Sequence, residues 1–310
     1  MISGFIAITL VWGSTWLAIK IGLESITPVF GVALRFTLAS AVLYAILRAR
    51  GGRIPFNRET MPVFLLLGFS SFSLPFVLVY WGEQYTGSGL ASILFGTYPF
   101  VVAVFSHLTL PGERLNSFKI AGTLLGFAGI VVIFWSDLSA GTAAFPGMAA
   151  IVLSTVLQGF SLVTVKRIAR HIPPVEMTLG GMIVSVAVLW VMAFAFEDPG
   201  AQRFDAAGIG SILYLGTFGS VLTFVMYYWL LKRVEALFLS LTSFLTPILA
   251  VVLGAIFLDE TLHGRVYAGG AMVLLGIAVA NGRDLLAMAE KQSLRFYAGE
   301  STPADKPTQE

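Results

Sequence analysis

Long apolar stretches follow one another along the whole chain, and only short polar segments separate them. A helix that spans a membrane needs about 20 mostly apolar residues. Proline and glycine mark several of the breaks, among them Pro111-Gly112 and Pro173-Pro174. The stretches that meet the length requirement are residues 2–22, 28–49, 60–82, 87–108, 115–135, 146–167, 174–196, 206–231, 235–258 and 264–283. The pattern therefore predicts an all-α membrane protein with ten transmembrane helices.

The second half of the chain repeats the pattern of the first. With a shift of 148 positions, residues 67–99 lie over residues 215–247 without a gap, and nine of the 33 positions are identical. A shift of 146 aligns Lys20 with Lys166, and a shift of 147 aligns Glu113 with Glu260. Self-similarity at a nearly constant spacing indicates a duplicated unit. We therefore predict a first five-helix repeat (1–140), a second five-helix repeat (141–283) and a disordered polar tail (284–310) in the cytoplasm.

The basic residues predict the orientation in the membrane. With the amino terminus in the cytoplasm, 15 of the 19 Lys and Arg residues fall on the inner side, three fall on the outer side and Arg35 lies within a span. Cytoplasmic loops of membrane proteins carry this excess of positive charge. We therefore expect a multi-pass protein of the plasma (inner) membrane with both termini cytoplasmic. Because five spans is an odd number, the second repeat crosses in the opposite sense, which is the inverted-repeat plan of many secondary transporters.

The composition narrows the class of protein further. Hydrophobic residues make up 57% of the 310 residues and charged residues 12%, whereas soluble domains carry roughly 25% charge. There is no cysteine, and the three histidines are scattered near span ends, so we expect no metal site and no cofactor. No lysine precedes Ser or Thr, which argues against a phosphate loop of the ATPase kind. We therefore expect the protein not to be an enzyme.

The acidic residues all lie near the ends of predicted spans. This placement argues against a proton relay that uses a buried carboxylate in the middle of the membrane. Glu113 and Glu260 each follow a helix break and precede a helix. A carboxylate in such a place complements the positive end of a helix, and a gating ion pair is the alternative role.

Short motifs make the sequence resemble a known family. They are the opening WGSTWLAIK from Trp12 to Lys20, the Leu34-Arg35-Phe36 segment, the mid-helix prolines, and the GERL and DETL turns. In these features the chain resembles the EamA-type members of the drug/metabolite transporter superfamily over about residues 3–283. The resemblance implies a ten-helix inverted-repeat carrier that moves small metabolites, often outward. Aromatic amino-acid exporters, nucleotide-sugar carriers and triose-phosphate carriers share this architecture, so the resemblance leaves the cargo open.

Six polar or aromatic residues between the interfaces are our candidates for substrate binding. A lipid-facing helix would exclude Arg and Gln, so these side chains are expected to face inward. The candidates are Trp12, Thr15, Arg35, Tyr98, Gln158 and Ser243. Arg35 could hold a substrate carboxylate, or it could bond helix carbonyls and fix helix packing. The aromatic and hydroxyl residues could line a cavity, or they could serve packing alone.

Other residues have structural interpretations. Pro99 and Pro247 occupy equivalent mid-span positions in the two repeats, where a proline can form a hinge or a static bend. We interpret Tyr80-Trp81 and Tyr227-Tyr228-Trp229 as interfacial aromatic belts. The glycines of the fifth span, Gly122, Gly126 and Gly129, predict close helix packing.

The leading hypothesis is a secondary transporter that exports small metabolites such as amino acids by alternating access. One intramembrane arginine suits one carboxylate, whereas a phosphorylated cargo of the nucleotide-sugar or phosphate-ester type would need several cations at depth. A membrane-embedded enzyme would need clustered His, Asp or Glu at one interface, and a scaffold or sensor would need a larger polar surface. The expected partners are a small-molecule substrate and the lipid bilayer, without nucleic acid, and the sequence is compatible with a monomer.

Overall fold

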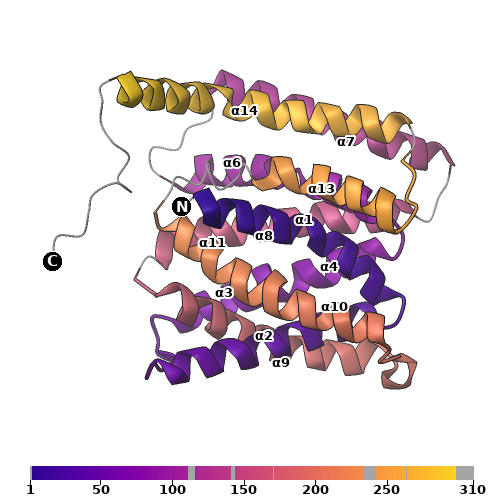
Figure 1. Cartoon of the computed structure of the whole chain (residues 1–310), viewed down its shortest axis with the longest axis vertical. Helices are drawn as coiled ribbons and strands as arrows, with labels where there is room; N and C mark the ends of the chain where they lie inside the picture. The colour runs from indigo at the N-terminus through magenta and orange to yellow at the C-terminus, as the bar shows by residue number, and fades with distance from the viewer. Residues whose placement is uncertain are drawn as a thin grey trace.

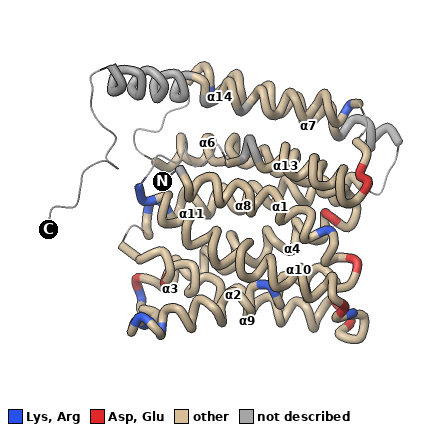
Figure 2. The backbone as a smooth tube through the Cα atoms, in the orientation of Figure 1, with Lys and Arg blue, Asp and Glu red and all other residues tan. Residues whose placement is uncertain are grey.

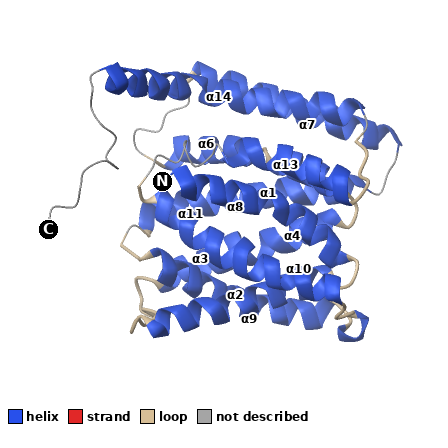
Figure 3. Cartoon of the chain, viewed as in Figure 1, coloured by secondary structure: helices blue, strands red, loops and turns tan. Residues whose placement is uncertain are grey.

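The computed structural model describes residues 2–110, 116–140, 144–169, 171–233, 242–262 and 264–297, with the side chains of 2, 134–140, 243–245, 277, 281 and 283–297 outside the description. Within these ranges every regular element is a helix (Figure 3). The helices of the first half are α1 (Ile2–Leu23), α2 (Pro28–Ala49), α3 (Met61–Leu67), η1 (Gly68–Ser73), α4 (Leu74–Glu83), α5 (Ser88–Phe95), α6 (Tyr98–Thr109) and α7 (Ser117–Ala140). Those of the second half are α8 (Ala144–Ile168), α9 (Pro174–Phe196), η2 (Pro199–Ala201), α10 (Ala206–Gly216), η3 (Thr217–Leu222), α11 (Thr223–Leu231), α13 (Thr242–Phe257) and α14 (Gly264–Tyr297).

The described residues confirm the prediction of an all-helical protein with helices that can span a membrane. Seven helical stretches are long and apolar enough to cross a membrane: Ser3–Leu23, Pro28–Ala49, Met61–Glu83, Ser88–Thr109, Ala144–Ile168, Pro174–Phe196 and Ala206–Leu231. Three shorter apolar helices, Ser117–Ile133, Thr246–Phe257 and Gly264–Ala280, coincide with the remaining predicted spans. Apart from Arg35 within α2, the charged residues gather at the two ends of the bundle (Figure 2), as expected because a charge inside the bilayer is costly.

Two spans contain a short π-helical turn at the same place in each half. The turn η1 separates α3 from α4, and η3 separates α10 from α11. Gly68 opens the first turn and Gly216 directly precedes the second, and these glycines are repeat equivalents. A π-helical turn widens the helix locally and leaves main-chain groups available to partners outside it, and such turns occur often at functional sites.

The helices lie in stacked layers (Figure 1). The helix α2 packs on α9, α4 on α8, and α1 on α13, so each of these contacts joins the two halves of the chain. The helices α7 and α14 pack mainly on each other and form one edge of the bundle (Figure 1).

Glycines explain how α7 and α14 come so close. A Cβ atom added to Gly129 would lie 2.5 Å from the carbonyl oxygen of Gly269, and one added to Gly122 would collide with the carbonyl oxygen of Gly276. Larger residues would push the two backbones apart, which is why small residues are enriched in such membrane contacts. The predicted role of the glycines in close helix packing is confirmed at these positions.

Carboxylates from the second half cap helices of the first half. Glu260 accepts hydrogen bonds from Ser88 N at 2.7 Å, Ser88 Oγ at 3.0 Å and Gly89 N at 3.1 Å, at the start of α5. Glu260 therefore complements a helix start, but of α5 and not of the α14 helix that follows it in the chain. Glu113 lies outside the described residues.

The start of α2 is capped in the same way. Glu197 accepts from Val29 N and Phe30 N, both at 2.9 Å, and from the Thr27 hydroxyl at 2.6 Å. These bonds satisfy main-chain N–H groups that have no partner inside the helix. Together the two glutamates hold the halves against each other at one end of the bundle, which we call the Lys20 end because Lys20 also lies there.

A third carboxylate at this end caps α10. Asp205 accepts from Gly208 N at 2.8 Å and from the Ser25 hydroxyl at 2.6 Å. The hydrogen bond from Gly208, and after it the one from Ser25, lowers the pKa of the Asp205 carboxyl below its ordinary value. The cap therefore keeps its charged form at neutral pH and joins the loop after α1 to the start of α10.

Candidate functional site

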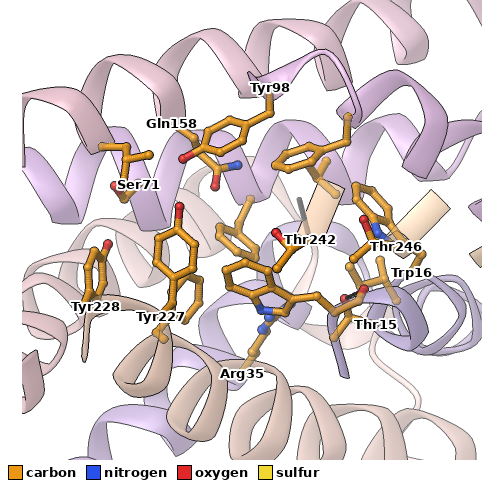
Figure 4. A pocket seen from close by; sticks show the side chains of 17 residues that line it. Thr15, Trp16, Arg35, Ser71, Tyr98, Gln158, Tyr227, Tyr228, Thr242 and Thr246 are labelled. Carbon is orange, nitrogen blue, oxygen red and sulfur yellow. Dashed lines mark hydrogen bonds between the residues drawn. The ribbon is translucent and has the colours of Figure 1, made fainter. Parts of the chain in front are cut away.

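A central cavity of about 110 Å³ lies between the two halves of the bundle (Figure 4). Its walls come from helices of both halves, and most of the side chains that form them are aromatic or aliphatic. The lining residues are Trp12, Thr15, Trp16, Ile19, Arg35, Ser71, Phe76, Val79, Phe95, Tyr98, Gln158, Leu162, Phe224, Tyr227, Tyr228, Thr242 and Thr246. Five of the six predicted substrate residues are in this set. The side chain of the sixth, Ser243, lies outside the described residues, and Thr242 beside it lines the cavity.

Many lining residues are repeat equivalents of one another. With the shift of 146, Trp12 corresponds to Gln158 and Trp16 to Leu162, and both members of each pair line the cavity. With the shift of 148 the same holds for Phe76 with Phe224, Val79 with Tyr227 and Tyr98 with Thr246. The cavity therefore lies where corresponding faces of the two halves meet.

Arg35 is the one charged side chain among these lining residues, and it is 2% exposed. Its Nε donates to Ser220 Oγ at 2.9 Å and its Nη2 to the carbonyl oxygen of Gly219 at 3.1 Å, both in η3. Its Nη1 donates to the Tyr80 hydroxyl at 3.4 Å. The guanidinium also lies 4.8 Å from the centre of the Phe76 ring, a favourable cation–π distance.

The partners of Arg35 bear on both of its predicted roles. The bonds to η3 are the packing role anticipated from the sequence. A guanidinium has five N–H donors, and the three hydrogen bonds leave two of them. Because Arg35 also lines the cavity, the remaining donors make an anion-binding role compatible with the packing role.

Trp12 is tied to the same π-helical turn. Its indole Nε1 donates to Thr223 Oγ1 at 3.0 Å, and that hydroxyl donates to the carbonyl oxygen of Gly219 at 2.8 Å. The carbonyl oxygen of Gly219 therefore accepts from both Thr223 and Arg35. The Trp12 ring packs on Tyr227 at 5.1 Å and on Phe224 at 5.7 Å between centroids. Two of the predicted wall residues of the first half are thus positioned by the second half, Arg35 by η3 itself and Trp12 by Thr223 directly after η3.

The opposite wall carries neutral polar groups. Tyr98 and Gln158 lie side by side on the wall opposite Arg35, and the hydroxyl of Tyr98 faces that of Tyr227 (Figure 4). The ring of Tyr98 stacks on Phe95 with centroids 5.7 Å apart. Ser71, which also lines the cavity, shares a hydrogen bond of 2.6 Å with Ser161, and Thr97 and Thr155 share one of 3.1 Å. The cavity is therefore positive on one side and neutral on the other.

The assignment of three tyrosines to interfacial belts is wrong. Tyr80, Tyr227 and Tyr228 are buried; the latter two line the cavity, and Tyr80 is a partner of Arg35. Trp81 and Trp229, in contrast, are 37% and 39% exposed, as belt residues would be. Counting residues along a helix gives the depth of a side chain but not the face on which it lies, and successive residues of a helix point in different directions.

The two predicted hinge prolines lie in different local structures. The helix that contains Pro99 is interrupted, because α5 ends at Phe95 and α6 begins at Tyr98. Pro99 therefore lies in the first turn of α6, where its missing N–H leaves no gap in the hydrogen bonding. Pro247 lies inside α13. Both places allow a bend, and their role as hinges stays a prediction.

Glu83 was missed as a candidate by sequence reasoning. It is the last residue of α4 and is 0% exposed, and neither carboxylate oxygen has a hydrogen-bond partner among the described residues. Its position at a span end suggested contact with water. The packing of α1, α5 and α8 around α4 buries it, and this packing has no signature in the residues next to Glu83.

The fold and the cavity define a class of protein: a multi-pass helical membrane protein with a central cavity between two halves. Among the described residues no group of three or more His, Asp or Glu side chains could hold a metal ion. The EamA-like transporter family model matches residues 1–135 and 145–282. The chain belongs to the EamA-like transporter family.

Several relatives match over almost the whole chain. An uncharacterized transporter of Archaeoglobus fulgidus is 30% identical over 86% of this chain and 94% of its own length. A probable terminal-alkyne amino-acid exporter of Streptantibioticus cattleyicolor is 29% identical over 88% of this chain and 91% of its own. The uncharacterized transporter YoaV of Bacillus subtilis is 26% identical over 88% and 94%. A protein of known crystal structure, 25% identical, superposes with a TM-score of 0.67 over 89% of this chain and 95% of its own.

Proposed function

We propose that this protein is a secondary transporter that exports small carboxylate-bearing metabolites, such as amino acids, by alternating access. The observation that carries the proposal is the central cavity, in which a buried arginine faces aromatic and amide side chains. Membership of a transporter family supports it. The amino-acid exporter among the relatives supports the cargo class.

The proposed architecture is ten spans in two inverted repeats, residues 1–140 and 141–283, related by a pseudo-two-fold axis in the membrane plane. The repeat-equivalent residues around the cavity support this arrangement, because such an axis passing through the cavity would bring equivalent residues together there. The equivalent π-helical turns η1 and η3 support it as well.

In the proposed mode of binding, Arg35 holds the anionic group of the substrate. Trp12 and Tyr98 contact the apolar body, while Thr15, Gln158 and Ser243 provide hydrogen bonds for polar substituents. Bends at Pro99 and Pro247 open the cavity to each side in turn. The cavity has no group suited to chemistry on the substrate among its described lining residues, and we propose no enzymatic activity.

The proposed orientation places the Lys20 end outside the cell and both termini in the cytoplasm of the plasma (inner) membrane. In the proposed cycle, the hydrogen bonds of Glu197 and Glu260 between the two halves hold the Lys20 end closed. Because Glu260 joins the second half to α5 of the first, opening toward the outside would require its three hydrogen bonds to break. A cysteine introduced at position 53 should react with an impermeant reagent only after the membrane is opened, and reaction in intact cells would contradict this orientation.

Counterflow in liposomes tests the proposed function. Purified protein is reconstituted with an unlabelled compound inside, and entry of the same labelled compound is followed. The compounds are aromatic and aliphatic amino acids, a nucleotide sugar and a phosphate ester, and protein-free liposomes are the control. We expect exchange with amino acids. Exchange with the phosphate ester alone would favour the other carrier class, and exchange with no metabolite across a broad screen would favour a non-transporting scaffold.

A further inference from the structure

We propose that Glu83 is the proton-binding site through which this transporter draws on the proton gradient. The proposal rests on the proposed transport function and adds the coupling ion to it. It starts from a buried carboxylate that the substrate site does not use.

The surroundings of Glu83 favour its neutral form in this conformation. The residue is fully buried, and both of its carboxylate oxygens lack a hydrogen-bond donor among the described residues. An ionised carboxylate without donors is costly to bury, and such a group takes up a proton instead. A proton is therefore the ligand that suits the site.

Lys20 is the cation that could pair with an ionised Glu83, but in this conformation its ammonium binds main-chain oxygens instead. Its ammonium donates to the main-chain carbonyl oxygens of Glu83 at 2.6 Å and of Thr86 at 2.7 Å. These two carbonyls belong to the end of α4 and the turn before α5. The ammonium therefore occupies carbonyl oxygens that a metal ion such as Na⁺ would need, and its charge repels a second cation. This arrangement favours a proton over a metal ion as the coupling ion.

Three charged groups act on Glu83: Lys20 on α1, Arg35 on α2 and Glu260 after α13. The titratable neighbour on α4 itself is Tyr80, which is neutral. The other elements packed against α4 are η1, α5 and α8. Of these, η1 and α5 have no titratable residue, and α8 has only Lys166 and Arg167 in its last turn, far along the helix. Movement of Lys20 is thus the simplest change that would alter the charge state of Glu83.

The site adjoins the cavity along two helices. Val79 lines the cavity one helical turn before Glu83, about 6 Å along the axis. Ile19 lines it directly before Lys20. Tyr80, which lies between Val79 and Glu83 on α4, is hydrogen-bonded to Arg35. Substrate bound at Arg35 would therefore act on the same helix end that carries Glu83.

The coupling step is a proton exchange with water. When the Lys20 end opens, the contacts of α4 and α5 loosen, and Glu83 takes up a proton from water on that side. When the opposite end opens, Glu83 releases this proton to water in the central cavity, and Lys20 leaves the two carbonyls to pair with the carboxylate. No bond other than O–H forms or breaks. One proton crosses with each cycle in exchange for one substrate molecule.

The test separates exchange from net, gradient-driven transport. Glu83→Gln mimics the protonated acid permanently, and Glu24→Gln is the matched control because Glu24 is an exposed carboxylate at the same end. With one proton per cycle, a gradient of one pH unit drives about tenfold accumulation of a substrate that is itself neutral overall. We expect this accumulation in the wild type and in Glu24→Gln. In Glu83→Gln we expect counterflow to persist while the response to the pH gradient is lost.

Two results would overturn the proton site: accumulation by Glu83→Gln equal to that of the wild type, or accumulation by the wild type that follows a Na⁺ gradient instead of the pH gradient. Absence of counterflow in the wild type would instead overturn the proposed function. A spectroscopic measurement is independent of transport. The infrared C=O stretching band of a protonated carboxyl should be present in purified wild type at neutral pH and absent in Glu83→Gln, and an unchanged band would contradict the assignment.

Discussion

The two π-helical turns share one backbone form but have different partners. In the first half, η1 packs on α9, where Gly181 leaves room for Leu67 and Phe72, and Ser73 bonds to Ser185 at 3.0 Å. In the second half, η3 packs on α2, and there Arg35 bonds to Ser220 and Gly219. With the shift of 146, Gly181 is the repeat equivalent of Arg35.

The backbone elements of the two halves therefore correspond, but the side chains that form the site differ between the halves. The position that holds no side chain in α9, Gly181, holds the buried cation Arg35 in α2, so the positive charge of the cavity lies beside η3 and has no counterpart beside η1. In the proposed alternating-access cycle, repeat symmetry would supply the movement, because the backbone elements correspond. The recognition of a single anionic group then needs a residue that breaks the symmetry. The following substitutions test this difference, beginning with the largest expected effect.

Replacement of the cation should have the largest effect. Truncation of one partner in a buried charged pair typically costs about 2–5 kcal/mol, which corresponds to at least about 30-fold in affinity. We expect Arg35→Gln to weaken transport of carboxylate substrates by this factor and to affect neutral amide analogues much less. Competition in the counterflow assay gives both affinities. An equal loss for both kinds of substrate, together with lower thermal stability, would show that Arg35 serves packing alone.

The serines at the two turns should respond unequally. Ser220→Ala removes the acceptor of Arg35 Nε, and a hydrogen bond to a charged group contributes about 1.5–3 kcal/mol. Ser71→Ala removes a neutral hydroxyl that contacts those of Ser161 and Tyr228, and Ser161 can turn to its own helix, so we expect a loss of about 0.5–1.5 kcal/mol. Denaturation of the purified variants measures the difference. Equal losses of stability in the two variants would show that the hydrogen bonds at the two turns contribute equally.

The glycine at the first turn should not tolerate a methyl group. A Cβ at Gly181 would lie 2.6 Å from Leu67 Cβ and 2.9 Å from Phe72 Cε2, and overpacking of this kind costs about 1–3 kcal/mol. We expect Gly181→Ala to lower the midpoint of thermal unfolding. Gly210→Ala is the matched control, since a Cβ atom added to Gly210 would meet nothing within 4 Å. Unfolding of both variants at the same temperature would contradict the tight packing of Gly181 against η1.

The smallest effect is expected at Trp12. Trp12→Phe keeps a ring against Tyr227 but loses the hydrogen bond from the indole to Thr223. A neutral hydrogen bond contributes about 0.5–1.5 kcal/mol, so we expect a modest drop in stability and a weaker substrate affinity of at most about tenfold. Trp12→Ala, which also loses the ring, should lower affinity further. A normal affinity in Trp12→Ala would exclude Trp12 from the substrate site.

The spans and the wall residues of α1 could be predicted from the sequence because they depend on local properties. The length of an apolar run and the spacing of Trp12, Thr15 and Trp16 along one helix are visible without the rest of the fold. The partners of Arg35 were not predictable in this way. They depend on a π-helical turn in the other half, and no residue of Thr217–Leu222 marks that turn as different from an ordinary helix.

The burial of side chains near span ends was the second feature that could not be predicted from the sequence. Tyr227, Tyr228 and Glu83 were placed by depth, and depth suggested the interface for all three. Their burial results from neighbours that are distant in the chain, such as α8 against α4. The repeat could have revealed Tyr227, since its equivalent Val79 lies on the cavity face of α4, but that face becomes apparent only when the helices are assembled.

The glycine contact between α7 and α14 has a consequence for biosynthesis. Gly122 and Gly129 meet Gly276 and Gly269, which are close to the end of the membrane-embedded chain. Chains are made from the amino terminus, and contacts between distant segments form late. The small-residue face of α7 therefore lacks its partner until α14 has been made. A ribosome that stalls before residue 264 would release a protein with the cavity largely built but with this edge unsealed, a feature by which membrane quality control could recognise an unfinished chain.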